Sequence, residues 1–199
     1  MSELYDAVVD AWDEEFARNR RLHGARISCR AGCSDCCHQL FQITEPEAAR
    51  VWQGIQGLDS ADAELIRRRA AQYLVERQQI VAATGAEPEA WGSLPPAGAR
   101  LACPTLDQGV CKIYAYRPMI CRKFGVPLWN PDRPGRVHAC ELNFKDGEAI
   151  EDPQLIQIQT GLHMEWKRVQ TEYNSKGGPR NSQPITIARA ILEELGALL

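Results

Sequence analysis

Eight cysteines in two groups are the residues of this 199-residue chain whose type and spacing could do chemistry. The first group is dense, since its four thiols lie within nine residues, and the second is spread over 103–140. Thiolates bind zinc and iron–sulfur clusters because both prefer soft, negatively charged donors. We therefore expect the two groups to come together around metal, and the candidate ligands are Cys29, Cys33, Cys36, Cys37, Cys103, Cys111, Cys121 and Cys140.

A framework of disulfides is the alternative use of eight thiols, and the compartment decides between the two. The segment Met1–Asp6 has neither the basic stretch nor the apolar run of a signal peptide, so we expect the protein in the cytoplasm. Clustered thiols in a reducing compartment more often bind metal or do redox chemistry. Cys36 and Cys37 are also adjacent, and neighbouring cysteines rarely bridge without strain. The sequence therefore favours metal over disulfides.

The composition is that of a soluble globular protein, with 44% hydrophobic and 25% charged residues. A net charge of −3 argues against nucleic acid as the partner of the whole molecule. No apolar run approaches the ~18 residues that a membrane span needs. We expect binding to neither nucleic acid nor membrane, which leaves an unidentified protein as partner or substrate.

Apolar residues recur with helical periodicity in the segments that must position the thiols. Thr44 and Glu47 have the spacing of a capping box, Asp59 or Ser60 can cap the next helix, and Asp152 can cap a later one. The segment 40–43 is expected to be extended. The expected helices are 3–20, 45–54, 60–84, the stretch from Asp152 to the stop at 177–179, and a last helix marked by apolar residues from 187 to 198.

Prolines and glycines break up the rest of the chain, so residues 86–102 read as a crossing loop and 103–140 as short turns. Pro118 pushes Arg117 toward an extended conformation and can open a helical turn that carries Cys121, with Gly125 closing it. The sequence thus predicts a mainly α fold, a small single domain of amphipathic helices around irregular Cys-rich loops. The domain covers 1–199, with a metal-binding core at 29–140 and a helical C-terminal extension at 152–198.

Two arginines beside the cysteines are candidates for the surroundings of the bound group. Four thiolates around zinc, or around an oxidised four-iron cluster, leave about two negative charges. Arg117 and Arg122 could offset this charge and donate hydrogen bonds to sulfur. His38 and His138 lie nearest the cysteines and are alternative ligands. The plain alternative is that these side chains are ordinary loop residues.

Two segments of the chain match the sequence pattern of a known family. The matching stretches are Cys29-Arg30-Ala31-Gly32-Cys33-Ser34-Asp35-Cys36-Cys37, Cys103-Pro104-Thr105-Leu106, Gly109-Val110-Cys111-Lys112-Ile113-Tyr114, Arg117-Pro118 and Cys121-Arg122-Lys123-Phe124. Together they resemble the YkgJ-type cysteine-cluster proteins, a family described as zinc- or iron-chelating with a CxxxCxxCC signature. The resemblance covers about 29–125 and implies a bound metal or iron–sulfur centre, but no defined activity. A lysine methylase acting on flagellin shares the signature.

The spacing Cys29-x3-Cys33-x2-Cys36 also resembles that of radical S-adenosylmethionine enzymes. Those enzymes usually have an aromatic residue before the third cysteine, where this chain has Asp35. Their barrel needs alternating strands and helices, and strand signals are almost absent. Cys37 and the second cysteine group would have no role in it, so we do not favour this class.

An iron–sulfur cluster with a redox or maturation role is the favoured hypothesis, because only one CxxC pair is present and iron–sulfur ligands tolerate irregular spacing. Zinc is the alternative, in an interaction module without catalysis. A protein-modifying enzyme related to the flagellin lysine methylase is a third class, and no catalytic residue can be assigned. We further expect Cys33 and Cys121 to share one coordination sphere. Metal should also order the segment 86–150, whose few apolar residues cannot offset its backbone entropy.

Overall fold

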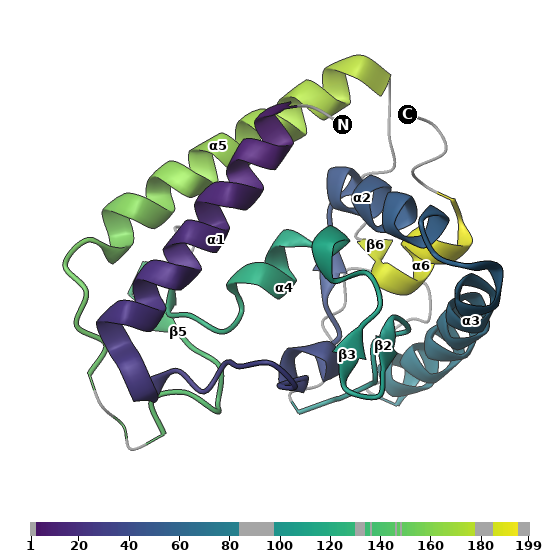
Figure 1. Cartoon of the computed structure of the whole chain (residues 1–199), viewed down its shortest axis with the longest axis horizontal. Helices are drawn as coiled ribbons and strands as arrows, with labels where there is room; N and C mark the ends of the chain where they lie inside the picture. The colour runs from purple at the N-terminus through teal and green to yellow at the C-terminus, as the bar shows by residue number, and fades with distance from the viewer. Residues whose placement is uncertain are drawn as a thin grey trace. The chain divides into compact units, whose positions relative to one another are not determined.

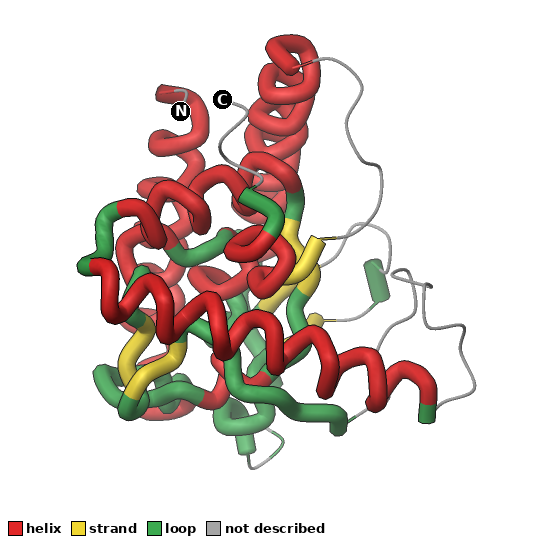
Figure 2. The backbone as a smooth tube through the Cα atoms, turned by 90° about the vertical axis from the view of Figure 1, so that its right-hand side faces the viewer, coloured by secondary structure: helices red, strands yellow, loops and turns green. Residues whose placement is uncertain are grey.

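Helix dominates the backbone of the protein (Figure 2), which confirms the predicted mainly α fold. The structure is a computed structural model that describes residues 3–83, 98–129, 134–135, 137–145, 147, 149–177 and 185–194. The strands within these ranges are two residues long and form three separate antiparallel pairs. The cysteines lie on the short turns, strands and loops between the longer helices.

The chain folds into two compact units, each built from separate stretches of sequence. Unit 1 comprises Met1–Ala31 and Met119–Gly178, and unit 2 comprises Gly32–Pro118 and Pro179–Leu199. The organisation of 1–199 as a single domain stays a prediction.

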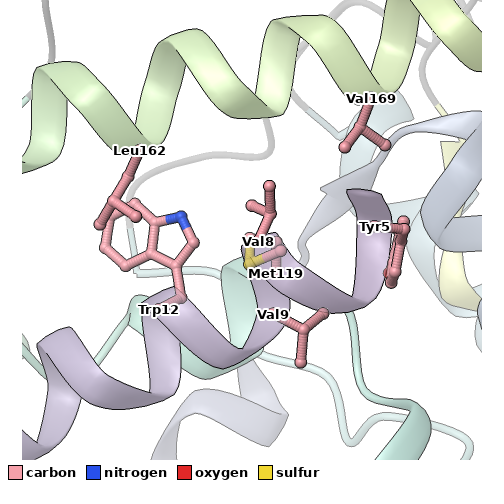
Figure 3. Close-up of a cluster of buried hydrophobic side chains, with 7 residues drawn as sticks. All are labelled: Tyr5, Val8, Val9, Trp12, Met119, Leu162 and Val169. Carbon is pink, nitrogen blue, oxygen red and sulfur yellow. The ribbon is translucent and has the colours of Figure 1, made fainter. Parts of the chain in front are cut away.

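Unit 1 is formed by two long helices that run side by side, α1 (Glu3–His23) and α5 (Leu155–Gly177), with the short α4 (Met119–Lys123) against α1 (Figure 1). The 3₁₀ turn η1 (Gly24–Arg26) continues α1, and β4 (Leu128–Trp129) pairs with β5 (Val137–His138). The apolar core follows from the spacing of large residues along α1 and α5. Trp12 on α1 and Leu162 on α5 face each other there (Figure 3). The buried cluster is Tyr5, Val8, Val9, Trp12, Met119, Leu162 and Val169.

The C-terminal half of α1 buries polar side chains rather than apolar ones. The guanidinium of Arg18 donates to both carboxylate oxygens of Glu15, at 2.6 and 2.9 Å, and to Asp152, at 2.5 and 3.3 Å. Asp152 also accepts from the backbone N–H of Gln154, so the predicted cap is present, and α5 starts two residues after Pro153. The network joins the start of α5 to α1. His23 lies one turn beyond it and is 3% exposed.

Unit 2 is built on three helices, α2 (Glu45–Gln56), α3 (Ser60–Ala82) and α6 (Ile187–Leu192). The predicted caps are confirmed: the carboxylate of Glu47 accepts from the backbone and hydroxyl of Thr44, at 2.7 Å each, and Asp59 accepts from the N–H of Asp62 at 2.9 Å. The strand β1 (Gln42–Ile43) lies in the segment expected to be extended and pairs with β6 (Ile185–Thr186).

The short helix α6 completes the core of unit 2, since it packs against both α2 and α3 (Figure 1). Its small residues Ala188 and Ala190 are fully buried, which lets the backbones approach, and Ile191 is fully buried beside them. The helix ends at Leu192, and Glu194 has φ +50°, which is a left-handed conformation that stops a helix. Residues 195–198 of the apolar pattern that predicted a last helix lie outside the described residues.

The hairpin of β2 (Leu106–Asp107) and β3 (Val110–Cys111) carries part of the second cysteine group. Its two-residue turn, Gln108-Gly109, has φ +47° and +81°, as a type I′ turn requires. Arg69 on α3 anchors the hairpin by donating to the backbone carbonyl of Leu106 at 3.1 Å and to Asp107 at 2.8 Å. The sequence predicted only short turns in this segment.

Candidate metal centre

The two cysteine groups are joined within unit 2 by backbone hydrogen bonds. Cys36 and Cys37 lie on the 3₁₀ turn η2 (Asp35–His38). The N–H of Cys103 donates to the carbonyl of Cys37 at 2.7 Å, and Leu101 donates to His38 at 3.0 Å. These two bonds bring chain segments more than sixty residues apart alongside each other. Within unit 2, Cys37 therefore lies beside Cys103.

A buried threonine lies between two of these thiols. The hydroxyl of Thr105 is 3.3 Å from the sulfur of Cys103 and 3.6 Å from that of Cys111. Cys111 reaches this place because β3 pairs with β2, which puts Cys111 opposite Leu106. Thr105 is 2% exposed, so water does not compete for its hydroxyl. The side chain thus fixes the two sulfurs on one side of the hairpin.

The neighbouring thiols of Cys36 and Cys37 are hydrogen-bonded to each other. A hydrogen bond from the Cys37 thiol lowers the pKa of Cys36 to about 7, and the charge of Arg117 acts in the same direction. The same bond, together with burial, raises the pKa of Cys37. Burial also raises the pKa of Cys103. The four thiols Cys36, Cys37, Cys103 and Cys111 influence one another electrostatically, so they form a connected set.

Arg117 is placed as the Arg-Pro element predicts. Its backbone is extended, with φ −60° and ψ 143°, after the 3₁₀ turn η3 (Tyr114–Tyr116). The guanidinium carbon lies 3.9 Å from the centre of the Tyr114 ring, a cation–π distance. Because this stacking holds the side chain near Cys36, the positive charge can favour a thiolate there.

Unit 1 carries the other three cysteines: Cys29, Cys121 and Cys140. Cys29 lies against Gly125, and its sulfur is 3.8 Å from the Gly125 carbonyl oxygen. A Cβ added at Gly125 would be 2.2 Å from that sulfur, which is far inside contact distance. Glycine is therefore required there by space rather than by a left-handed backbone.

Cys121 lies on α4, the helical turn that the sequence predicted after Pro118. Its neighbour Arg122 is 7% exposed and pairs with Asp13 on α1 at 2.6 Å. Arg122 thus pairs with a carboxylate, and its predicted role beside the bound group stays a prediction. Cys140 is buried at the end of the β4–β5 segment.

The two histidines named as alternative ligands have different surroundings. The Nδ1 atom of His38 is 3.0 Å from the carbonyl oxygen of Ser34, so this nitrogen is a donor and only Nε2 remains for a metal. His138 is exposed on β5. None of the eight cysteines, all of which lie in described ranges, forms a disulfide.

The donor set fits zinc or iron in its chemistry, because it is made of partly buried thiols. The thiols do not form a complete coordination sphere, since within the described ranges no three Cys, His, Asp or Glu side chains are arranged to hold a metal ion. Unit 2 contributes Cys33, Cys36, Cys37, Cys103 and Cys111, and unit 1 the remaining three. A coordination sphere shared by Cys33 and Cys121 stays a prediction, as do the eight assigned ligands.

Two residues that matter to this geometry have no signal in the sequence: Thr105 and Asn143. Each donates or accepts next to a cysteine sulfur, and each is buried, at 2% and 5% exposure. Their role depends on which distant segments pair, so a single sequence does not single them out.

The chain belongs to the CxxCxxCC family, whose model, described as "Putative zinc- or iron-chelating domain", matches residues 28–141. The match spans all eight cysteines and agrees with the cysteine-cluster resemblance read from the motifs. No curated protein and no solved structure matches the chain. The family supports metal binding by the cysteine cluster and leaves the choice between zinc and iron open. No helix in the described ranges has the length and apolar character to cross a membrane.

Proposed function

We propose that the protein holds an iron–sulfur centre on its cysteine loops and acts in electron transfer or in cluster maturation. The observation that carries the proposal is the hydrogen bond of Cys103 to Cys37, at 2.7 Å, which joins the two cysteine groups. A centre built there would draw on soft donors from both groups, as iron–sulfur and zinc sites require.

The arrangement of the second group favours iron–sulfur over zinc. Structural zinc sites commonly take two thiols from one tight knuckle of the CxxC kind. The hairpin here supplies one thiol ahead of β2, from Cys103, and one on β3, from Cys111. The hydroxyl of Thr105 lies within hydrogen-bond distance of both sulfurs, and hydrogen bonds to ligand sulfur are a means by which proteins tune the reduction potential of a cluster.

Purification without oxygen tests the proposal. We expect iron and acid-labile sulfide in similar amounts, with visible absorbance that bleaches on reduction. Cys103→Ser should remove most of both, whereas Ser34→Ala, a neighbouring change that leaves the thiols intact, should keep them. Zinc without sulfide would support the interaction module instead. A protein that retains neither zinc nor iron would overturn the proposal.

A further inference from the structure

Asn143 is the residue at which three chain segments of unit 1 meet. Its backbone N–H donates to the carbonyl of Cys140 at 2.8 Å, which closes a turn behind that cysteine. Its side-chain oxygen accepts from the backbone N–H of Ser28 at 2.7 Å, next to Cys29. Its amide nitrogen donates to the carbonyl of Gly125 at 2.5 Å.

The same amide nitrogen lies 3.9 Å from the sulfur of Cys29. A carboxamide has two N–H donors, so one can serve Gly125 and the other the sulfur. The orientation of the amide is set by its backbone partners, because Ser28 N–H needs an acceptor and the Gly125 carbonyl needs a donor. The nitrogen must therefore face Cys29.

Further bonds fix the segment on both sides of Ser28. The hydroxyl of Ser28 donates to the carbonyl of Leu142 at 2.7 Å, and the N–H of Phe144 donates to the carbonyl of Arg26 at 3.1 Å. On its other side the sulfur of Cys29 lies against Gly125, where an added Cβ would be 2.2 Å from it.

We propose that Asn143 is a positioning residue of the metal centre, which holds the Cys29 sulfur against Gly125 and ties it to the turn of Cys140. Its N–H supplies a hydrogen bond to the sulfur when Cys29 binds as a thiolate. The inference rests on the proposed function, since it names how two of its ligands are presented. Asn143 lies beyond the residues matched by the family model, 28–141.

Alkylation of the metal-loaded protein, read cysteine by cysteine by mass spectrometry, tests the inference. In Asn143→Ala we expect Cys29 to react at least about tenfold faster than in the wild type. Removing a residue that orients a metal ligand typically lowers metal affinity by about tenfold or more, and the protection of the ligand should fall by a similar factor. Cys103, in unit 2, should keep its wild-type rate. The amide of Ser28 should also lose protection from hydrogen exchange.

Asn19→Ala is the matched control, because Asn19 is a fully buried asparagine of the same unit that bonds to Glu15 rather than to the cysteine segments. Asn143→Asp keeps the acceptor for Ser28 and loses the donor to Cys29, so it should also release Cys29, and it decides the matter if Asn143→Ala fails to fold. Equal protection of Cys29 in the decisive variant and the wild type, or equal release in Asn19→Ala, would overturn the inference. A wild type without zinc or iron would instead overturn the proposed function.

Discussion

Replacing Gly125 with alanine tests whether the Cys29 sulfur has to lie where the structure places it. The added methyl group would sit 2.2 Å from that sulfur and 3.3 Å from the ring of Phe16. Ordinary contacts of a Cβ begin at about 3.4 Å, so the sulfur has to retreat by more than about 1 Å.

The cost to the fold and the cost to the metal centre should differ. Overpacking a well-filled site typically costs about 1–3 kcal/mol. The thiol of Cys29 can rotate about a single bond, which puts the loss of unfolding free energy near the lower end of that range. A thiolate–metal bond of about 2.3 Å tolerates only about 0.2 Å, so the same displacement removes Cys29 as a ligand.

Urea unfolding gives the stability, and alkylation of the metal-loaded protein gives the protection of Cys29. Gly161→Ala is the control, because Gly161 is an exposed position of α5 with nothing within 4 Å of the added atom. Alanine there should raise the unfolding free energy by up to about 1 kcal/mol and leave Cys29 protected. If Gly125→Ala keeps wild-type metal content with Cys29 protected, the sulfur does not need the space that glycine leaves.

Three further changes have defined outcomes. Thr105→Val keeps the shape of the side chain but loses the hydroxyl, and it should make Cys103 react faster with alkylating reagents when metal is bound. An unchanged rate would show that the contact of the Thr105 hydroxyl with the Cys103 sulfur does not hold that thiol in place. Below about pH 6.5 the urea midpoint should fall, because burial lowers the pKa of His23. His23 then binds a proton in the unfolded chain at a pH at which it stays neutral in the folded protein. His23→Gln should flatten that slope, and an unchanged slope would count against His23. Arg117→Ala should lower metal retention more than Arg67→Ala, which removes another arginine near an aromatic ring, and equal retention in the two variants would refute a special role.

The helices could be predicted closely because their signals are local. The capping box at Thr44 and the cap at Asp59 place the starts of α2 and α3 within one residue of the prediction. The expected end of the second of these helices near residue 84 lies outside the described residues, as does most of the crossing loop at 86–102. The end of α6 at Leu192 could not be predicted from the apolar pattern, because that pattern continues past Glu194, whose backbone is left-handed.

The site was harder to predict because its geometry depends on pairing across long stretches of chain. The thiols and Arg117 follow from residue type and spacing, yet the bond from Cys103 to Cys37 has no periodic signal. The turn Gln108-Gly109 lacks the Asn or Asp that usually marks a type I′ hairpin. The role of Asn143 can be recognised only from its hydrogen bonds to Ser28 and Gly125, which are distant in the sequence.

The pairing of β1 with β6 has a consequence for the order in which the protein can fold during its synthesis. Residues 42–43 find their strand partner only at 185–186, and the fully buried Ala188 and Ile191 follow directly. A growing chain therefore contains Cys33 to Cys111 before it contains the helix that completes the core of unit 2. The fold of unit 2 is therefore completed only when the last part of the chain has been made, long after the residues of its cysteine turns.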